Sequence, residues 1–206
     1  LRVAEQLGRP WLYTDRKGLG RLAAFAEKNG EQTVFEQLRL RAFLIDDLDD
    51  VSRAADPVAV RPEDVAFIQY SSGSTSEPKG VVLTHRNILA NARGTTQVTG
   101  FTDRDISVSW MPLTHDMGLI GFFIMMFANR IQLNLMPTEL FVRRPLLWTT
   151  FLSRKNATLS SSPNFGYRHY LRVLCERRIE GIDLSSVRLV FNGAEPISVE
   201  LCDEFM

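Results

Sequence analysis

Short apolar runs alternate with amphipathic stretches along most of the chain. Apolar runs bounded by Gly, Pro or charged residues are typical of strands, and apolar residues that recur every three or four positions indicate helices. This pattern predicts strands over residues 11–13, 42–45, 65–70, 81–83, 107–110, 132–136, 157–161 and 187–191. It predicts helices over residues 1–7, 19–28, 84–91 and 118–128, with further helices beginning near Pro145, Pro163 and Ser198. Such alternation favours an α/β fold.

The best candidate for a linker is the stretch 51–64, which holds two prolines and scattered charges. It separates a leading α/β segment, residues 1–55, from a segment over residues 56–206 that carries most of the chemical signals. The chain begins at Leu1 inside one helical pattern and ends at Met206 inside another. Natural helical termini would produce this pattern. We favour a piece of a larger protein, because neither end carries a boundary signal.

Composition limits the possible functions. With 206 residues, of which 45% are hydrophobic and 23% charged, the chain can bury a sizeable core and is not disordered. Its 24 Lys and Arg balance 24 Asp and Glu, so no overall basic field favours a nucleic acid or an anionic membrane. Cys175 and Cys202 are too few for a disulfide framework and lie in apolar periodic segments, so we expect core positions and a cytoplasmic setting. The longest charge-free apolar stretch, 117–129, is too short for a membrane span.

A phosphate-binding loop is indicated by residues 70–80, Tyr-Ser-Ser-Gly-Ser-Thr-Ser-Glu-Pro-Lys-Gly, which follow a predicted strand. Hydroxyls and bare backbone amides bind phosphate oxygens, glycines let the backbone approach, and a lysine offsets the charge. The loop does not fit the Walker A pattern, because Pro78 precedes Lys79 and Gly80 follows it. An exposed Ser/Gly turn is the alternative interpretation.

This loop resembles that of the adenylate-forming superfamily, which contains acyl-CoA synthetases, adenylation domains of nonribosomal peptide synthetases and fatty acyl-AMP ligases. The family pattern is approximately [Thr/Ser]-Ser-Gly-[Ser/Thr]-[Thr/Ser]-Gly-x-Pro-Lys-Gly, and residues 71–80 match it with Ser76 in place of the usual glycine. The resemblance continues through residues 84–87, Thr-His-Arg-Asn. It implies ATP and Mg²⁺ as cofactors, with Lys79 catalytic. The residues implied to bind the β- and γ-phosphates are Ser72, Gly73, Ser74, Thr75 and Lys79.

An acyl-side motif follows in residues 110–121, Trp-Met-Pro-Leu-Thr-His-Asp-Met-Gly-Leu-Ile-Gly, which resembles Trp-Leu-Pro-Leu-x-His-Asp-Met-Gly-Leu-Ile-Gly of the fatty acyl-AMP ligases. A His beside an Asp is by itself often a structural hydrogen bond. The resemblance implies that His115 is catalytic and positions the acyl carboxylate, that Asp116 orients it, and that Met117 and Gly118 line the substrate site. Amino-acid-activating relatives place an acidic residue near this histidine, so the substrate is expected not to be an amino acid. No second His or Cys lies at ligand spacing, and no metal-ligating residues are predicted.

Two more segments resemble the same subgroup. Residues 140–145 and 160–167 are similar to Phe-Leu-x-Arg-Pro and Ser-Gly-Gly-Pro-Asn-Phe, with Ser161 and Ser162 in place of the paired glycines. If these serines border the acyl chain, they narrow its pocket, so no long-chain preference is carried over. The apolar stretch 121–127 is a core helix, or in part the lining of a lipid tunnel.

A turn after the last predicted strand, residues 190–196, reads Val-Phe-Asn-Gly-Ala-Glu-Pro. Alone it is an ordinary strand-to-helix turn. In the family the matching Gly-Ala-Glu-Pro backbone packs against adenine. The residues implied to bind the nucleotide base are Asn192, Gly193, Ala194, Glu195 and Pro196.

The resemblance as a whole implies the central portion of the large N-terminal domain of such an enzyme, with mixed sheets covered by helices. The expected activity is that of an acid–thiol ligase: a fatty or other apolar carboxylic acid is activated as acyl-AMP and passed to the pantetheine thiol of an acyl carrier protein or CoA, for lipid metabolism or for polyketide or nonribosomal peptide synthesis. The competing hypothesis is a non-catalytic nucleotide- or acyl-binding module. Because further motifs of the family would lie beyond Met206, we expect residues 1–206 alone to be inactive.

Overall fold

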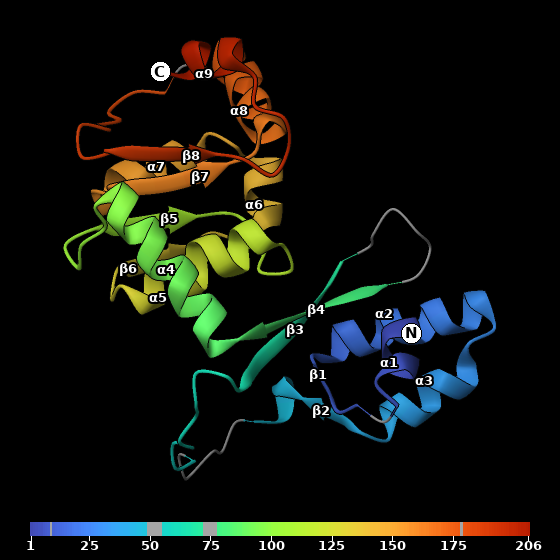
Figure 1. The fold of residues 1–206 in the computed structure, drawn as a ribbon. Helices are drawn as coiled ribbons and strands as arrows, with labels where there is room; N and C mark the ends of the chain where they lie inside the picture. The colour runs from blue at the N-terminus through green and yellow to red at the C-terminus, as the bar shows by residue number, and fades with distance from the viewer. Residues whose placement is uncertain (9, 49–54, 72–77, 178) are drawn as a thin grey trace. The chain divides into compact units, whose positions relative to one another are not determined.

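The computed structural model describes residues 1–8, 10–48, 55–71, 78–177 and 179–206. These residues form two compact units, Leu1–Arg86 and Asn87–Met206 (Figure 1). Both contain helices and strands, and the sheets are mixed overall, because one pair is antiparallel and the other pairs are parallel. The α/β prediction is therefore confirmed. The division into residues 1–55 and residues 56–206 is based on which segment carries the motifs, and it stays a prediction.

The first unit combines a parallel strand pair with three helices and an antiparallel hairpin. Its elements are α1 (Arg2–Gln6), β1 (Leu12–Thr14), α2 (Arg16–Asn29), α3 (Gln32–Arg39), β2 (Ala42–Leu44), the 3-10 helix η1 (Ile45–Asp47), β3 (Val65–Ser71) and β4 (Lys79–Thr84). β1 pairs with β2, and β3 pairs with β4. Helix α2 begins where the Asp15 carboxylate accepts a hydrogen bond from the Gly18 N–H and ends at Gly30, whose φ of 70° is left-handed.

The second unit is built on a four-stranded parallel sheet. Its strands, in the spatial order β6-β5-β7-β8, are β6 (Gln132–Leu135), β5 (Ile106–Ser109), β7 (Leu159–Ser162) and β8 (Leu189–Asn192). Its helices are the greater part of α4 (His85–Thr99), the π-helix η2 (Met117–Ile124), α5 (Met125–Ala128), α6 (Thr138–Arg143), α7 (Leu147–Lys155), α8 (Asn164–Glu176) and α9 (Val199–Phe205). The chain adds β6 on one side of β5 and then crosses to add β7 and β8 on the other. The order of strands therefore reverses between β5 and β7.

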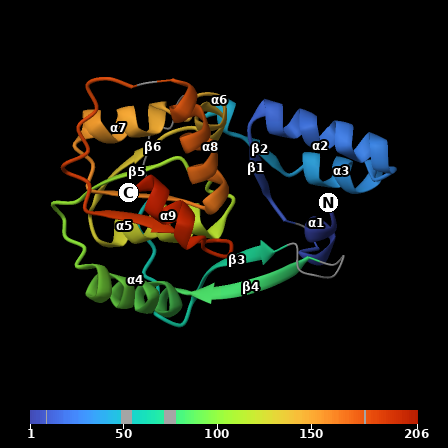
Figure 2. The ribbon, with the colours of Figure 1, turned by 90° about the horizontal axis from the view of Figure 1, so that it is seen from above.

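Helices cover both faces of this sheet. One apolar cluster joins the sheet to α6, α7, α8 and α9 through side chains such as Trp110, Phe141 and Trp148. The other joins it to α4 and α5 through Ala92 and Met126. Figure 2 accordingly shows α7 and α4 on opposite sides of the strands. The unit is a three-layer α/β/α sandwich, in which a parallel sheet is buried on both faces.

An ion pair fixes the amino-terminal edge of the sheet. Asp105 precedes β5, is only 4% exposed, and accepts hydrogen bonds from Arg188 Nε at 2.8 Å and Arg188 Nη2 at 2.6 Å. Arg188 precedes β8 and also donates to the carbonyls of Thr99 and Gly100. The hydrogen bonds from Arg188 hold the pKa of the Asp105 carboxyl well below its usual value of 3.8. Asp105 is therefore ionised under ordinary conditions.

Several local predictions need correction. β4 begins at Lys79, so Lys79 and Gly80 belong to a strand and not to the loop before it. α4 extends to Thr99 instead of ending near residue 91. Cys175 is exposed and Cys202 is half-buried, and both are free thiols. The prediction that both cysteines lie in the core is therefore wrong. Within the described ranges, no helix has the length and apolar character that crossing a membrane requires.

Candidate functional site

The carboxyl-terminal edge of the parallel sheet gathers most of the predicted site residues of the second unit. In open parallel sheets, ligands bind outside the carboxyl ends of the strands, at the point where the strand order reverses. Here that point lies between β5 and β7. The loop 110–116 follows β5, Pro163 follows β7, and the turn 193–197 follows β8. The acyl-side and adenine-side motifs therefore end at one edge.

His115 is exposed and its ring is oriented by a backbone amide. The Met117 N–H donates to His115 Nδ1 at 3.2 Å, and the His115 N–H donates to the Pro112 carbonyl at 3.1 Å. Because Nδ1 accepts, the neutral ring carries its proton on Nε2, which can donate to a carboxylate. In the described part of the chain, Asp116 forms no hydrogen bond or ion pair with His115. The amide of Met117, and not the predicted carboxylate, orients the ring.

Gly118 allows the first turn of η2 to pack on the loop before it. It is buried, and a Cβ atom built at this position would clash with the carbonyl of Pro112. Gly121, one turn later, has open space where its Cβ would be. The atoms that exclude a side chain at Gly118 belong to the backbone of Met111 and Pro112, which cannot move aside as a flexible side chain could. Gly118 therefore supports the conformation of the loop that carries His115.

The turn after β8 is fastened to the start of α8 by Asn164. Asn164 Oδ1 accepts hydrogen bonds from Asn192 Nδ2 at 2.7 Å and from the Ser198 N–H at 3.4 Å, and its Nδ2 donates to the carbonyl of Pro196. Ala194 has a left-handed φ of 72°, which is uncommon for a residue with a side chain. The sequence indicated the Pro-Asn motif but not this positioning role, because the bonds join residues 28 to 34 positions apart.

Glu195 also binds the start of α8. Its Oε1 accepts from the Phe165 N–H at 2.8 Å, close to the positive end of the helix dipole. This bond uses one of the two carboxylate oxygens, and Ala194, Glu195 and Pro196 remain exposed to solvent. The turn therefore presents backbone and small side chains to solvent, and the bond of Glu195 to the Phe165 N–H attaches it to the start of α8.

Three buried polar atoms near this edge have no hydrogen-bond partner in the described part of the chain. They are Trp110 Nε1, Ser161 Oγ and Asn192 Oδ1. Buried polar groups without partners are uncommon in folded proteins, and an ordered water, an ion or a functional role usually accounts for each of them. Ser161 and Ser162 are themselves fully buried, and Ser162 leaves no room for a side chain at Gly166 of α8. The two hydroxymethyl groups therefore occupy space that paired glycines would leave open.

The phosphate-loop prediction falls largely outside the described residues. Ser72, Gly73, Ser74 and Thr75 belong to the range 72–77, which the structure does not describe. Lys79 is described: it is exposed, opens β4, and pairs through its backbone with Ser71 of β3. Among the described residues its amine has no ion-pair partner. Lys79 belongs to the first unit, and His115 and Asn192 belong to the second.

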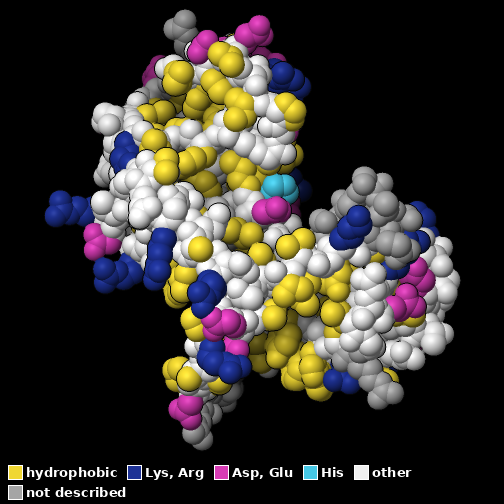
Figure 3. Space-filling view, in the orientation of Figure 1, with side chains coloured by type: hydrophobic (Ala, Val, Ile, Leu, Met, Phe, Trp, Pro, Cys, Tyr) yellow, Lys and Arg dark blue, Asp and Glu magenta, His cyan; other side chains and the backbone are white. Residues whose placement is uncertain are grey.

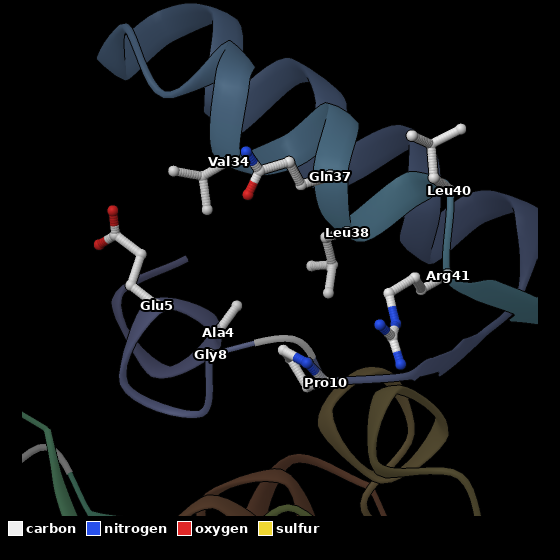
Figure 4. A pocket seen from close by; sticks show the side chains of 9 residues that line it. All are labelled: Ala4, Glu5, Gly8, Pro10, Val34, Gln37, Leu38, Leu40 and Arg41. Carbon is white, nitrogen blue, oxygen red and sulfur yellow. The ribbon is translucent and has the colours of Figure 1, made fainter.

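A hollow of about 670 Å³ lies in the first unit, between α1 and α3. Figure 4 shows Val34, Gln37 and Leu38 on one side of it and Glu5 on the other. Arg41, which also lines the hollow, lies over the Trp11 ring at 4.3 Å. None of its nine lining residues is a predicted site residue. On the face drawn in Figure 3, Lys and Arg side chains are interspersed with Asp and Glu.

The described residues show no cluster of metal-ligating side chains. Within those ranges, no group of three or more His, Cys, Asp or Glu side chains lies together in a way that could hold an ion. Mg²⁺ bound to a nucleotide commonly takes one or two protein carboxylates together with phosphate oxygens and water, so it does not require such a group.

Comparisons with known proteins agree with the motifs. The sequence matches the AMP-binding enzyme family over residues 12–206. It is 42% identical over 150 residues to a putative acyl-CoA synthetase of Caulobacter vibrioides, covering 72% of this chain and 25% of that protein. It is 35% identical over 147 residues to a medium-chain-fatty-acid–acyl-carrier-protein ligase of Teredinibacter turnerae, covering 71% of this chain and 23% of that protein. The chain thus spans about a quarter of the length of these relatives.

Solved structures resemble the fold. A fatty acyl-adenylate ligase from L. pneumophila, in complex with acyl adenylate and pyrophosphate, has a TM-score of 0.71 and 37% identity, covering 82% of this chain and 30% of that one. McyG A-PCP, complexed with phenylalanyl-adenylate, has a TM-score of 0.85 and 29% identity, covering 99% of this chain and 31% of that one. The similarity over nearly the whole chain confirms that it corresponds to part of an adenylation domain.

Proposed function

This chain belongs to the AMP-binding enzyme family, and from that premise we propose that it carries the acyl and nucleotide sites of an enzyme that activates a fatty or other apolar carboxylic acid. A carboxylate oxygen of the acid attacks the α-phosphorus of ATP. The new C–O–P linkage forms as the bond between the α- and β-phosphates breaks, giving acyl-AMP and pyrophosphate. The acyl group then passes to the thiol of a pantetheine arm on an acyl carrier protein or CoA, and AMP is released.

The observation that carries this proposal is the arrangement at the carboxyl edge of the sheet. A histidine with an outward Nε2–H follows one strand, and a turn fastened in place follows another, with the reversal of strand order between β5 and β7. His115 would position the acyl carboxylate. Asp116, Met117 and Gly118 follow His115 directly in the chain and would line the same substrate site.

The turn fits a nucleotide base. Asn192 Oδ1 is buried and unpartnered within the described residues, and an acceptor of this kind suits the exocyclic amine of adenine. The exposed backbone from Gly193 to Pro196 would pack against the ring. ATP supplies the activated phosphorus and Mg²⁺ accompanies its phosphates, which the hydroxyls and amides of 72–75, together with Lys79, would bind. Because ATP is the co-substrate and both thiols are free, a cytoplasmic location is part of the proposal.

The acid is proposed to lack an α-amino group. Amino-acid-activating relatives place an acidic residue near the position of His115 to hold the substrate's amine, and in this chain that position is a histidine, followed by the apolar segment Gly121 to Phe127. The relatives support an acid of this class, since one is named for medium-chain fatty acids. The buried Ser161 and Ser162 favour a short or narrow chain over a long one.

ATP–pyrophosphate exchange tests the proposal. The experiment uses the complete enzyme, meaning a protein of the relatives' length that contains this chain. Exchange should occur with fatty acids and not with amino acids. Exchange with an amino acid and none with fatty acids would contradict the substrate class, and nucleotide binding without any exchange would favour the non-catalytic module.

Lys79→Ala tests the phosphate loop in the same assay. The exchange rate should fall roughly a hundredfold, because a charged donor stabilises the leaving pyrophosphate more in the transition state than in the ground state. Lys17→Ala is the matched control, since Lys17 is an exposed lysine of α2 in the same unit, and its exchange rate should stay unchanged. A Lys79→Ala rate within twofold of wild type would remove Lys79 from the site.

A further inference from the structure

A hollow at the carboxyl edge of the sheet has Arg168, His169 and Arg172 in its lining, and the function proposed above assigns no role to these three residues. It has a volume of about 390 Å³ and lies beside the first half of α8 and the turn after β8. Its lining residues are Asn164, Phe165, Arg168, His169, Arg172, Glu195 and Pro196. The α8 residues lie at spacings of one turn, so they form one stripe of the helix. The hollow shares Glu195 and Pro196 with the turn proposed to hold the nucleotide base.

The charges that line this hollow are predominantly positive. Arg168 and Arg172 both face it, and neither forms an ion pair within the described part of the chain. Glu195 is the one carboxylate among the seven lining residues, and its Oε1 already accepts from the Phe165 N–H at 2.8 Å. The two guanidinium groups outnumber this single carboxylate, so the lining keeps a net positive charge toward an anion from outside the chain.

His169 holds Arg172 in place. Its Nδ1 lies 3.2 Å from Arg172 Nη2, and its Nε2 lies 2.9 Å from the carbonyl of Val142 in α6. A guanidinium can only donate, so Nδ1 accepts and Nε2 carries the proton that the carbonyl receives. One edge of Arg172 is thus fixed by a ring that is itself fixed to a neighbouring helix, which leaves the remaining N–H groups of Arg172 to bind a ligand.

We propose that this hollow binds the phosphate of the pantetheine-bearing acceptor during the second half-reaction. Two guanidinium groups one helical turn apart match the oxygens of a tetrahedral phosphate, for which arginine is well suited. Every pantetheine thiol, on a carrier protein or on CoA, is linked through its arm to a phosphate. A phosphate held beside the turn that binds the acyl-AMP base would retain the acceptor next to its acyl donor. This inference rests on the proposed function.

A pair of ligands that differ only in the phosphate tests the proposal. The complete enzyme is titrated by calorimetry with 4′-phosphopantetheine and with pantetheine. Phosphopantetheine should bind about tenfold more tightly, the usual order for charge-assisted bonds to phosphate. The preference should disappear in the double variant Arg168→Gln/Arg172→Gln. It should persist in Arg104→Gln, which removes an exposed arginine elsewhere in the same unit.

Each outcome decides for or against the proposal. Equal binding of the two ligands to the wild type would overturn it, whatever the variants do. If the double variant weakens ATP binding but leaves the preference for phosphopantetheine intact, the anion is a nucleotide phosphate and the acceptor assignment is wrong. Arg172→Lys, a smaller change, replaces the double variant if that protein does not fold, and should reduce the preference. Failure of pyrophosphate exchange in the wild type would count against the proposed function alone, because the two titrations do not depend on turnover.

Discussion

The two edges of the four-stranded sheet differ in how completely their polar groups are paired. At the amino edge, Asp105 accepts bonds from Arg188, Thr158 and Thr102, and Arg188 donates in addition to two backbone carbonyls. At the carboxyl edge, polar atoms of Trp110, Ser161 and Asn192 lack partners in the described part of the chain. The Asp105–Arg188 pair is satisfied from within the chain, and near it only Ser107 Oγ, at the start of β5, lacks a partner among the described residues, against three such atoms at the carboxyl edge. We infer that substitutions at the first edge change stability alone, and that substitutions of polar side chains at the second edge also change binding.

The largest effect is expected from Asp105→Asn at the amino edge. Removing the charge leaves Arg188 without its anion and sets an amide against several donors, so the free energy of unfolding should fall by about 2–4 kcal/mol. Asp103→Asn is the matched control, because Asp103 is exposed and its nearest cation, Arg130, is 4.0 Å away. Its loss should stay below about 0.5 kcal/mol. Urea unfolding of both variants, monitored by circular dichroism, measures the difference, and equal losses would contradict the comparison.

The stabilisation by Asp105 should also depend on pH. A carboxyl whose pKa is lowered by folding contributes stability that is present above its unfolded pKa, here 3.8, and is lost as pH falls through the folded value. The advantage of the wild type over Asp105→Asn should therefore be full near about pH 7 and shrink as pH falls below about 4. An advantage that stays constant through this acid range would show that the lowered pKa is not its source.

A smaller loss of stability is expected from Gly118→Ala, which is compared with Gly121→Ala on the same helix. The new methyl group would press on the Pro112 carbonyl and shift the loop of His115, at a cost of about 1–3 kcal/mol. Gly121→Ala has open space and should be neutral or slightly stabilising, by up to about 1 kcal/mol. Thermal unfolding of the two variants gives the comparison. Similar melting temperatures would show that the close approach at Gly118 is relaxed in solution.

Asn164→Ala is expected to have the smallest effect on stability, about 1 kcal/mol, together with a selective effect on the nucleotide. Without the Asn164 side chain the turn loses its bonds at Asn192, Pro196 and Ser198, so the complete enzyme should bind ATP several-fold more weakly. Asn134→Ala removes another bond from a side-chain amide to a carbonyl, that of Ser107, and should leave ATP affinity unchanged. Equal ATP affinity for Asn164→Ala and wild type would show that Asn164 does not position the nucleotide-binding turn.

The sequence predicts the strands of the sheet better than the details of the site. Strands such as β5 and β7 lie between two helical layers, so their burial appears as short apolar or small-residue runs. The short helix α6 begins after Pro137 without a side-chain cap, so it has no clear start signal, and α3 lacks one as well. The motifs indicated His115 and the Asn192–Pro196 turn. The positioning by the Met117 amide and by Asn164 depends on folded geometry, which no local spacing reveals.

The reversal of strand order between β5 and β7 also sets an order of assembly during synthesis. Synthesis delivers the four strands in chain order, although a domain generally folds as a unit. β5 and β6, joined by a short crossover, can pair first, whereas β7 must wait for a partner some 50 residues back in the chain, and β8 is added last. The adenine-side turn follows β8 and reaches its place only through Asn164. The segment of His115 is therefore synthesised well before the turn that follows β8, and that turn can bond to Asn164 only after all four strands have been made.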